Sequence, residues 1–385
     1  MAVTVHGHCQ ERFEAVRRLL QNYVESGEEL GASIVVNVDG DDVLDLWGGF
    51  TTRDHSKPWE RDTIVNVFSM TKTTLSFALL LLADRKQLKL TDKVAKYWPE
   101  FAANGKQNIE IRHIMSHTSG LSGWDQPLVI EDLVNVPKLS ALLAQQQPWW
   151  EPGTASGYQS LSSGYLIGEV VRRVSGKSLK QFIAEDISAP LGADFQLGCQ
   201  ERDEPRRSDI FPPPMQFPPI EPSSIMAKTL SNPAMEIDFA NSLEFRKAEI
   251  GSGNGHTNAR GINRIMSVIS RHGRAQDGQE FLSETTINQV FQVQADGTDQ
   301  VLNFGAPIRW GTGFALPSAG TWIDWIPSGR ICTWGGFGGS IVIMDLERKI
   351  TISYAMNNLE VTFLGSVRTK AYVTAIYDAL ETSKV

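Results

Sequence analysis

Hydrophobic and polar positions along the chain follow two periods, and the strand-like pattern gathers near the two ends. Five short runs are apolar or alternate between apolar and polar residues: 32–38, 43–47, 331–334, 340–345 and 349–356. The pair Asp39-Gly40 between the first two runs is typical of a hairpin turn. Residues 11–25 and 361–382 carry apolar side chains at helical spacing. Each end of the chain therefore predicts strands and one helix.

The middle of the chain is predicted to be mostly helical. Residues 69–87 are apolar nearly all round, a pattern typical of a helix buried inside a domain. Helical spacing also covers 132–146 and 161–175. Six prolines in residues 211–222 exclude regular structure, because proline has no N–H donor, and predict a stiff loop. This loop is interpreted either as a wall over a cleft or as a rigid surface loop.

These patterns predict an α+β fold in which one antiparallel sheet is built from both ends of the chain and flanked by helices. The 385 residues exceed the roughly 150 of an ordinary domain, so two units are expected. One unit combines residues 1–85 and 240–385 around the sheet. The other is an inserted, mostly helical domain of residues 86–239, and the active site is expected in the cleft between the two.

Composition and charge exclude several classes of protein. Lys plus Arg number 36 against 44 Asp plus Glu, which gives a net charge of −8. Nucleic acid and anionic membranes are bound through clustered cations, so neither is an expected partner. The most apolar run, 75–83, is far shorter than the about twenty residues of a membrane span. With no secretory leader pattern and three scattered cysteines, a cytoplasmic protein is predicted.

Several common catalytic motifs are missing from the sequence. There is no Gly-x-Ser-x-Gly, no phosphate-binding glycine loop and no His-Glu-x-x-His. His113 and His117 are four residues apart. Because no carboxylate motif accompanies them, they are interpreted as capping or packing residues rather than as metal ligands. No metal and no other cofactor is therefore expected.

Ser69 and Lys72 form the single Ser-x-x-Lys sequence of the chain. A step of three residues along a helix returns to nearly the same face, so the two side chains are predicted to be neighbours. Ser69 lies at the start of the predicted buried helix, where N–H groups and the helix dipole favour a developing negative charge. Burial of Lys72 favours the neutral amine, which accepts a proton from a serine hydroxyl. The alternative is an ordinary helix N-terminus.

Two further segments carry candidate site residues. Tyr158 follows a Glu-Pro-Gly-Thr turn at a predicted loop-to-helix junction, from which a phenol reaches a cleft. The glycine-rich sequence 334–339 lies between two predicted strands, so its backbone is expected to approach a ligand closely. We expect the backbone N–H groups of Ser69 and Phe337 to form an oxyanion hole. The alternatives are a core tyrosine and a strand bulge.

In their order along the chain, these motifs resemble those of serine hydrolases with the class C β-lactamase fold, and most of all the family VIII carboxylesterases and related fungal transacylases. The matching stretches are Phe68–Lys72, Ile111–Leu121, Glu151–Thr154 with Tyr158, Gly168–Gly176, Pro190–Gly192, Trp310–Phe314 and Trp334–Gly336. They extend over roughly residues 15–380. The resemblance implies that Ser69 is the nucleophile, that Lys72 and Tyr158 activate it, and that segment 334–337 carries half of the oxyanion hole.

Two positions depart from the penicillin-recognising relatives. Those relatives have Tyr-x-Asn where this chain has Tyr158-Gln159-Ser160. Their third motif begins with Lys or His, which helps to hold the carboxylate of the substrate, whereas this chain has Trp334. An indole offers an apolar stacking surface in place of a cation. We therefore predict that Trp334, Gly335 and Gly336 contact an uncharged substrate.

The predicted function is that of a serine carboxylesterase that cleaves esters of small, apolar molecules. Ser69 attacks the ester carbonyl while Tyr158, with Lys72 beside it, takes the proton, and water resolves the acyl-enzyme. The first alternative is an acyltransferase of secondary metabolism that resolves the same acyl-enzyme with an alcohol or amine. A β-lactamase, a D-aminopeptidase and a non-catalytic binding protein on this fold are further alternatives. The expected partner is a small ester or acyl substrate.

Overall fold

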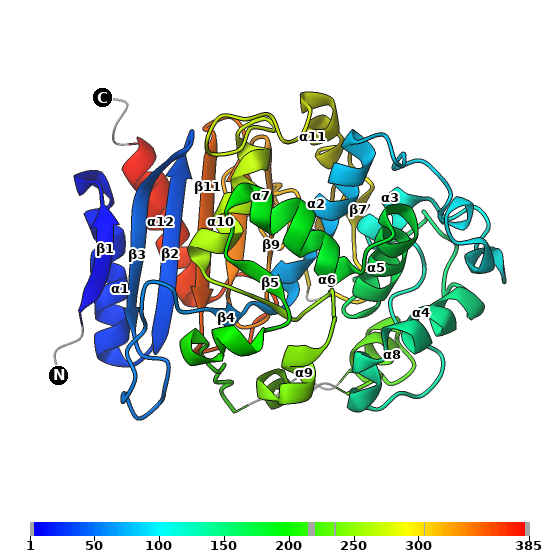
Figure 1. Cartoon of the computed structure of the whole chain (residues 1–385), viewed down its shortest axis with the longest axis horizontal. Helices are drawn as coiled ribbons and strands as arrows, with labels where there is room; N and C mark the ends of the chain where they lie inside the picture. The colour runs from blue at the N-terminus through cyan, green and yellow to red at the C-terminus, as the bar shows by residue number, and fades with distance from the viewer. Residues whose placement is uncertain (1–3, 215–219, 235, 304, 382–385) are drawn as a thin grey trace.

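The largest sheet of the protein has six antiparallel strands. The computed structural model describes residues 4–214, 220–234, 236–303 and 305–381. The sheet consists of β1 (Val5–Cys9), β2 (Gly31–Val38), β3 (Asp41–Gly49), β9 (Ile331–Gly335), β10 (Ile341–Asp345) and β11 (Ile350–Met356). Their order across the sheet is β1-β3-β2-β11-β10-β9. Strands from the two ends of the chain meet where β2 pairs with β11 (Figure 1), which confirms the predicted sheet.

The remaining elements are helices and short strands. The helices are α1 (Glu14–Ser26), α2 (Thr71–Asp84), α3 (Ile111–Met115), α4 (Val136–Gln145), α5 (Ser162–Ser175), α6 (Leu179–Phe182), α7 (Ala189–Leu191), α8 (Ile225–Leu230), α9 (Leu243–Lys247), α10 (Ala259–Ser270), α11 (Glu284–Val290) and α12 (Val367–Glu381). A second sheet contains β4 (Val65–Asn66), β6 (Gly255–Thr257) and β5 (Phe195–Leu197), and a third contains β7 (Ala295–Gly297) and β8 (Ile308–Trp310). The helices predicted at 11–25 and 161–175 correspond to α1 and α5.

Four strands of the large sheet, β2, β11, β10 and β9, are covered on both faces. Every residue of β9, β10 and β11 is buried, and β2 is buried except at its last residue. Strands covered on both faces are apolar almost throughout instead of alternating. This explains the continuous apolar runs in the sequence. In the turn between β2 and β3, Asp39 and Gly40 have φ values of 48° and 105°, which are the left-handed conformations that a tight hairpin needs.

Neighbouring residues of β11 show which helices cover each face of the sheet, because successive side chains of a strand point to opposite faces. Ser353 Oγ accepts a hydrogen bond from the Asn263 amide of α10 at 2.9 Å. The ring of Tyr354 packs on that of Tyr372 of α12. Helix α1 packs beside α12, so these two helices cover one face and α10 covers the other (Figure 1).

The strand β1 is absent from the predicted elements. It pairs with β3 at the edge of the sheet, and three of its five residues are exposed. Because an edge strand with so few covered side chains has little apolar periodicity, its sequence does not stand out from a polar segment.

Two predicted helices have different bounds in the structure. The helix expected at 132–146 is interrupted at Asn135, whose side-chain oxygen accepts a hydrogen bond from the Lys138 N–H at 3.1 Å and so begins α4. The helix expected at 361–382 begins only at Val367. Its last predicted residue, Thr382, lies outside the described residues. In both cases a local turn replaces the first part of the apolar pattern.

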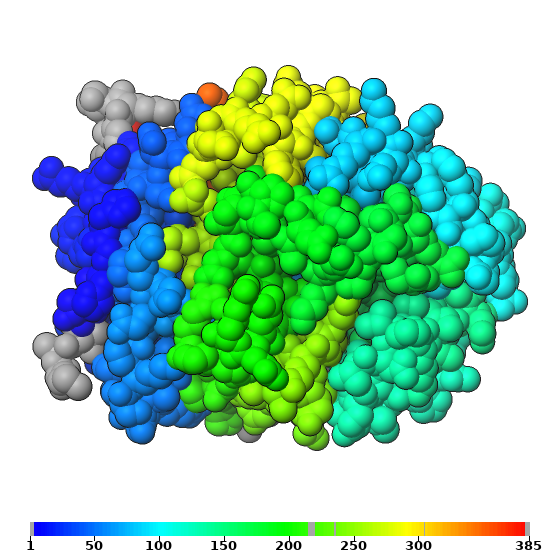
Figure 2. Space-filling model, in the orientation of Figure 1, coloured from blue at the N-terminus to red at the C-terminus, as the bar shows by residue number. Residues whose placement is uncertain are grey.

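The middle of the chain covers one end of the molecule. In Figure 2 the cyan and green segments form a continuous surface on the right, and the blue N-terminal segments lie at the opposite end. The division into a sheet domain (1–85 and 240–385) and a helical domain (86–239) stays a prediction, and β5 of the second range pairs with β6 of the first. Within the described ranges, no helix is both long and apolar enough to cross a membrane.

Candidate active site

Ser69 lies in a short 3-10 turn, Phe68–Met70, directly before α2, so the α-helix begins two residues later than the sequence pattern predicts. The φ of Phe68 is 43°, a left-handed conformation that costs a residue with a Cβ atom on the order of 1 kcal/mol. The side chain of Asn66 holds this turn: its oxygen accepts the Phe68 N–H at 3.2 Å and its amide donates to the Gly253 carbonyl at 3.0 Å. The strained turn presents the serine at the start of a buried helix.

Lys72 lies one turn after Ser69 and is buried. Its Nζ is 3.0 Å from Ser69 Oγ, 2.7 Å from the Ser160 carbonyl oxygen and 2.8 Å from the Ser252 carbonyl oxygen. None of these three partners carries a charge that would stabilise an ammonium. Burial therefore lowers the pKa of Lys72 well below its ordinary value of 10.5. A neutral amine next to a serine hydroxyl is able to accept its proton.

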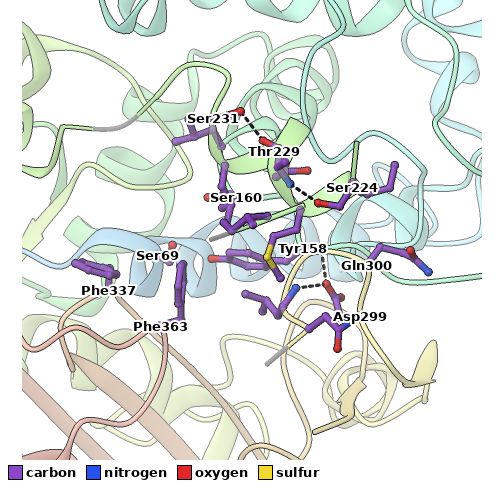
Figure 3. A pocket seen from close by; sticks show the side chains of 18 of the residues that line it. Ser69, Tyr158, Ser160, Ser224, Thr229, Ser231, Asp299, Gln300, Phe337 and Phe363 are labelled. Atoms are coloured by element: carbon purple, nitrogen blue, oxygen red, sulfur yellow. Dashed lines mark hydrogen bonds between the residues drawn. The ribbon is translucent and has the colours of Figure 1, made fainter. Parts of the chain in front are cut away.

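Tyr158 is buried on the other side of Ser69, and Figure 3 shows the two hydroxyl groups directed toward one another. Burial raises the pKa of the Tyr158 phenol, and the Asp299 charge raises it further. The Ser69 hydroxyl and the Trp334 indole N–H act in the opposite direction. Tyr158 Oη nevertheless forms no hydrogen bond of ordinary length with the described residues. The phenol is therefore protonated at neutral pH and available to a ligand.

The glycine-rich segment after β9 is pressed against the chain just before Ser69. A Cβ atom on Gly336 would lie 2.1 Å from the carbonyl oxygen of Val67, a distance that no real Cβ atom has. The ring of Phe337 meets that of Phe68 edge-on, with 6.2 Å between the centroids. The segment thus lies beside the nucleophile turn. The oxyanion hole formed by the N–H groups of Ser69 and Phe337 stays a prediction.

Trp334 belongs to a cluster of four buried or nearly buried aromatic rings. Its ring centroid is 4.8 Å from that of Trp310 and 5.2 Å from that of Tyr158. His117 packs edge-on against the Trp310 and Tyr158 rings, at 4.4 and 4.9 Å. Trp334 Nε1, like Tyr158 Oη, has no hydrogen-bond partner in the described part of the chain. Both atoms are thus buried polar groups that a ligand oxygen would satisfy.

Ser69 opens into a cavity of about 1190 Å³ (Figure 3). Ser69, Tyr158, Trp334 and Phe337 all line it, whereas Gly335 and Gly336 are not among its lining residues. For these two glycines, substrate contact stays a prediction. Many other lining residues come from one stretch of the chain: Ile220, Glu221, Pro222, Ser223, Ser224, Ile225, Met226, Ala227, Thr229, Leu230, Ser231, Pro233 and Ile237.

The end of the proline-rich loop is part of this cavity wall. Ile220 and Pro222 line the cavity, as expected for a loop that forms a wall. Phe211, at the start of the loop, is not a lining residue; its N–H donates to the Asn357 carbonyl oxygen at 2.7 Å. Residues 215–219 lie outside the described residues. The loop therefore forms part of the wall through its last residues.

Charged side chains are nearly absent from the cavity wall. Among the described lining residues, Glu221 and Asp299 carry a negative charge, and no Lys, Arg or His is present. The Lys72 nitrogen lies behind the wall, in contact with three oxygens. At the position where penicillin-recognising relatives keep a cation, the wall carries the Trp334 ring. A carboxylated ligand would meet no positive charge on this surface.

The two residues after Tyr158 face different surroundings. Ser160 lines the cavity. Gln159 is buried, and its amide donates to Ser119 Oγ at 3.1 Å. The Asn of the penicillin-recognising relatives is therefore replaced by a short hydroxyl at the cavity wall.

The two histidines have the capping and packing roles that the sequence analysis favours. His113 Nδ1 accepts a hydrogen bond from the Glu110 N–H at 3.1 Å at the start of α3. His117 Nδ1 accepts one from the Gln159 N–H at 3.2 Å, and burial lowers the pKa of His117 to about 3. Neither ring is placed as a metal ligand, because no group of three or more His, Cys, Asp or Glu in the described ranges is arranged to hold an ion.

One buried acidic residue of the site is missing from the sequence predictions. Asp299 lines the cavity, accepts the backbone N–H of Tyr158 at 2.9 Å and accepts the indole N–H of Trp310 at 3.1 Å. It lies 141 residues from Tyr158 along the chain. It belongs to no motif and to no periodic stretch, so the sequence carries no signal for it.

A serine on a strained turn, a buried lysine one helical turn further on and a buried tyrosine opposite define a class of serine hydrolases. The family model described as Beta-lactamase matches residues 16–373, so the chain belongs to the beta-lactamase family. This match confirms the resemblance inferred from the sequence motifs.

The relatives of the chain include both esterases and penicillin-binding proteins. "Esterase/beta-lactamase LipL" of Mycobacterium tuberculosis is 29% identical over 92% of this chain and 83% of its own length. A family VIII carboxylesterase of known crystal structure is 32% identical to this chain in sequence. The two structures match with a TM-score of 0.90 over 98% of this chain and 100% of that chain. A penicillin-binding protein homologue from Caulobacter crescentus is 30% identical, with a TM-score of 0.89 over the same shares. Simvastatin synthase (LovD) from Aspergillus terreus, 18% identical with a TM-score of 0.70 over 96% of this chain and 98% of that chain, shares the fold.

Proposed function

We propose that the protein is a carboxylesterase that cleaves uncharged, bulky esters through an acyl-enzyme on Ser69. The observation that carries this proposal is the cavity wall beside Ser69, which is mostly apolar and has no cation among its described residues. Relatives named as an esterase and as a family VIII carboxylesterase support ester cleavage. A negatively charged substrate would have to give up its hydration shell without gaining an ion pair.

Lys72 is the base of the acylation step. Burial lowers the pKa of Lys72 and raises that of Tyr158, so at neutral pH the amine is the better proton acceptor. Ser69 Oγ gives its proton to Lys72 Nζ, 3.0 Å away, as it attacks the carbonyl carbon of the ester. The N–H groups of Ser69 and Phe337 stabilise the oxyanion. This order differs from the sequence-based prediction, in which Tyr158 takes the proton first.

Tyr158 acts as the acid of the same step. The phenol gives its proton to the alcohol oxygen as the C–O bond breaks, and the Lys72 ammonium returns a proton to the phenolate. The alcohol leaves, and Ser69 carries the acyl group. In deacylation water attacks the acyl carbon and loses a proton to Lys72, and the Lys72 ammonium gives a proton to Ser69 Oγ as the acyl–oxygen bond breaks. Lysine and tyrosine thus end each cycle as they began it.

Intact-mass measurement after exposure to a fluorophosphonate or a p-nitrophenyl ester tests the nucleophile. The wild-type protein is expected to gain one phosphonyl or acyl group, and Ser69→Ala is expected to gain none and to lose turnover. Ser175→Ala is a matched control, because its hydroxyl donates to the Val171 carbonyl within α5, outside the cavity. Labelling and turnover that persist in Ser69→Ala would show that the proposal is wrong. Absence of labelling in the wild type would indicate a binding protein instead.

The size of the cavity favours acyl transfer as a second candidate function. Its volume of about 1190 Å³ exceeds the roughly 300–1,000 Å³ of pockets for drug-sized ligands, so an acyl group on Ser69 leaves room for an acceptor molecule. Incubation with an acyl thioester and an alcohol distinguishes the two candidates. An excess of acylated alcohol over free acid would indicate a transferase, and an excess of free acid a hydrolase.

The missing cation argues against β-lactamase and D-aminopeptidase activity. A cephalosporin that carries both an ester side group and the lactam amide tests this directly. We expect the ester to be cleaved while the lactam ring stays intact. Efficient opening of the ring would show that Trp334 does not exclude carboxylated substrates.

A further inference from the structure

The carboxylate of Asp299 is fully buried and lies where four N–H groups converge. Oδ1 accepts the backbone N–H groups of Tyr158, Val301 and Leu302, each at 2.9 Å. Oδ2 accepts the indole N–H of Trp310 at 3.1 Å. Figure 3 shows the carboxylate between the Tyr158 loop and its own loop.

No Lys or Arg forms a salt bridge with Asp299 within the described ranges. Burying a carboxylate without a cation is costly unless hydrogen bonds satisfy it, and here four neutral donors do so. A second contact joins the same two loops, because the Gln300 N–H donates to the Ser156 carbonyl at 2.8 Å. Two loops far apart in the sequence are thus fastened at one carboxylate.

The second carboxylate oxygen of Asp299, Oδ2, contacts the aromatic cluster behind Tyr158 through the Trp310 indole. The Trp310 ring is parallel to that of Tyr158, with an interplanar angle of 1° and 6.3 Å between centroids. The His117 ring is wedged edge-on against both of them. Because Asp299 fixes the backbone of Tyr158 and the ring of Trp310 at once, it determines where the phenol stands relative to Ser69.

We propose that Asp299 is a positioning residue that holds Tyr158 in the orientation needed to pass its proton to the leaving group. This inference rests on the role proposed above for Tyr158. Asp299 acts through the Tyr158 N–H and the Trp310 indole, and takes no proton itself.

Asp299→Asn tests the inference with almost no change in shape. An amide has one oxygen and one NH₂ group. The NH₂ group must therefore point either at the N–H of Trp310 or at the three backbone N–H groups, and in both cases two donors face one another. Tyr158 or Trp310 then has to shift. A displacement of about 1 Å at a reacting group costs on the order of 100-fold in rate. We expect acylation by an ester of an aliphatic alcohol, whose oxygen must be protonated as it leaves, to slow by about 10- to 100-fold, with KM within about threefold of the wild type.

A double-mutant cycle with Tyr158→Phe separates positioning from a general loss of structure. If Asp299 works through Tyr158, Asp299→Asn adds no further loss once the phenol is gone. If the two losses multiply, the inference is wrong. It is also wrong if Asp299→Asn raises KM and leaves the acylation rate unchanged, because Asp299 would then bind substrate.

Trp310→Phe in the Asp299→Asn background is a rescue experiment. It removes the N–H that faces the new amide, so part of the lost acylation rate is expected to return. If the Asp299→Asn protein does not fold, the Trp310→Phe protein replaces it in the double-mutant cycle. Trp310→Phe removes the N–H that donates to Asp299 Oδ2. No recovery in the double variant, or a Trp310→Phe loss that multiplies with Tyr158→Phe, would overturn the inference.

The control variant is Asp296→Asn, three residues earlier. Asp296 pairs with Arg309 at 2.7 Å on the surface, where both side chains are more than a third exposed, so its acylation rate is expected to equal that of the wild type. Failure of the proposed function is recognised separately. In that case Tyr158→Phe or Ser69→Ala would itself keep wild-type activity. Failure of this inference alone leaves both of these variants impaired, while Asp299→Asn keeps the wild-type rate or adds an independent loss.

Discussion

Replacement of Lys72 by methionine tests directly whether this lysine is a neutral base. Methionine fills a similar volume, but its thioether neither carries a charge nor takes up a proton from a serine hydroxyl. We expect Lys72→Met to lose acylation of Ser69. The stability of the variant is expected to depend on pH differently from that of the wild type, because burial lowers the pKa of Lys72 well below 10.5 in the folded protein.

The sign of this dependence follows from proton binding. Between the lowered folded-state pKa and 10.5, the unfolded wild-type chain holds a proton on Lys72 that the folded protein does not hold. Unfolding then takes up one proton, so the free energy of unfolding of the wild type rises by about 1.4 kcal/mol per pH unit relative to Lys72→Met. Over about two pH units within this window the difference between the two proteins changes by about 2.7 kcal/mol.

Lost hydrogen bonds do not obscure this slope. Lys72→Met leaves the carbonyl oxygens of Ser160 and Ser252 without their donor, which costs about 1–3 kcal/mol for each carbonyl that stays dry. Carbonyl groups do not titrate, so this cost shifts the whole curve by a constant amount. The slope therefore reports the protonation of Lys72 alone.

Urea unfolding of both proteins across this pH range measures the slope. Lys106→Met is a control for a buried lysine outside the site. Lys106 is also buried, and it donates a hydrogen bond to the Ala103 carbonyl oxygen at 2.7 Å. Burial lowers the pKa of Lys106 to about 8, so its slope begins only above that pH. A flat difference between the wild type and Lys72→Met over the range would show that Lys72 stays charged when folded. It would then be excluded as the base.

Two further substitutions test the packing around the site and the sheet. Arg368→Met is expected to lower the free energy of unfolding in urea by about 3–5 kcal/mol above pH 7. Burial raises the pKa of Glu29 to about 7, so above this pH the variant leaves a charged carboxylate, 2.7 Å from Arg368 in the wild type, without its cation. A loss below about 1 kcal/mol would contradict this. Gly336→Ala is expected to slow fluorophosphonate labelling at least about tenfold, since its Cβ would lie 2.1 Å from the Val67 carbonyl and must push the segment away from Ser69. Gly168→Ala in α5 is the matched control, because its Cβ would make only ordinary contacts with Leu179, at 3.4 and 3.7 Å, and Gly168 does not line the cavity.

The parts of the fold and site that the sequence predicts are those with a local chemical pattern. The buried inner strands read as continuous apolar runs, and the Ser69–Lys72 spacing brings the two side chains to one face because helix geometry is fixed. In each case neighbouring residues determine the outcome, so a single sequence suffices.

What the sequence does not predict depends on partners that are far away along the chain or on a single side chain. Asp299 meets Tyr158 across 141 residues, and nothing near Asp299 distinguishes it from a surface acid. The break before α4 depends on the one side chain of Asn135. The raised pKa of Tyr158 is also beyond the motifs, because the burial that causes it exists only once the chain is folded.

The site combines apolar walls with buried polar atoms that have no partner. Tyr158 Oη, Trp334 Nε1 and Ser252 Oγ are all buried without a hydrogen bond among the described residues. A bound ester brings a carbonyl oxygen and an alcohol oxygen to Ser69, and both oxygens accept hydrogen bonds from donors of this kind without carrying a charge. A carboxylate would meet the same donors but no cation on the described wall, so its negative charge would stay unbalanced. The proposed preference for neutral esters rests on these donors and on the indole of Trp334, which stands in the place of a cation.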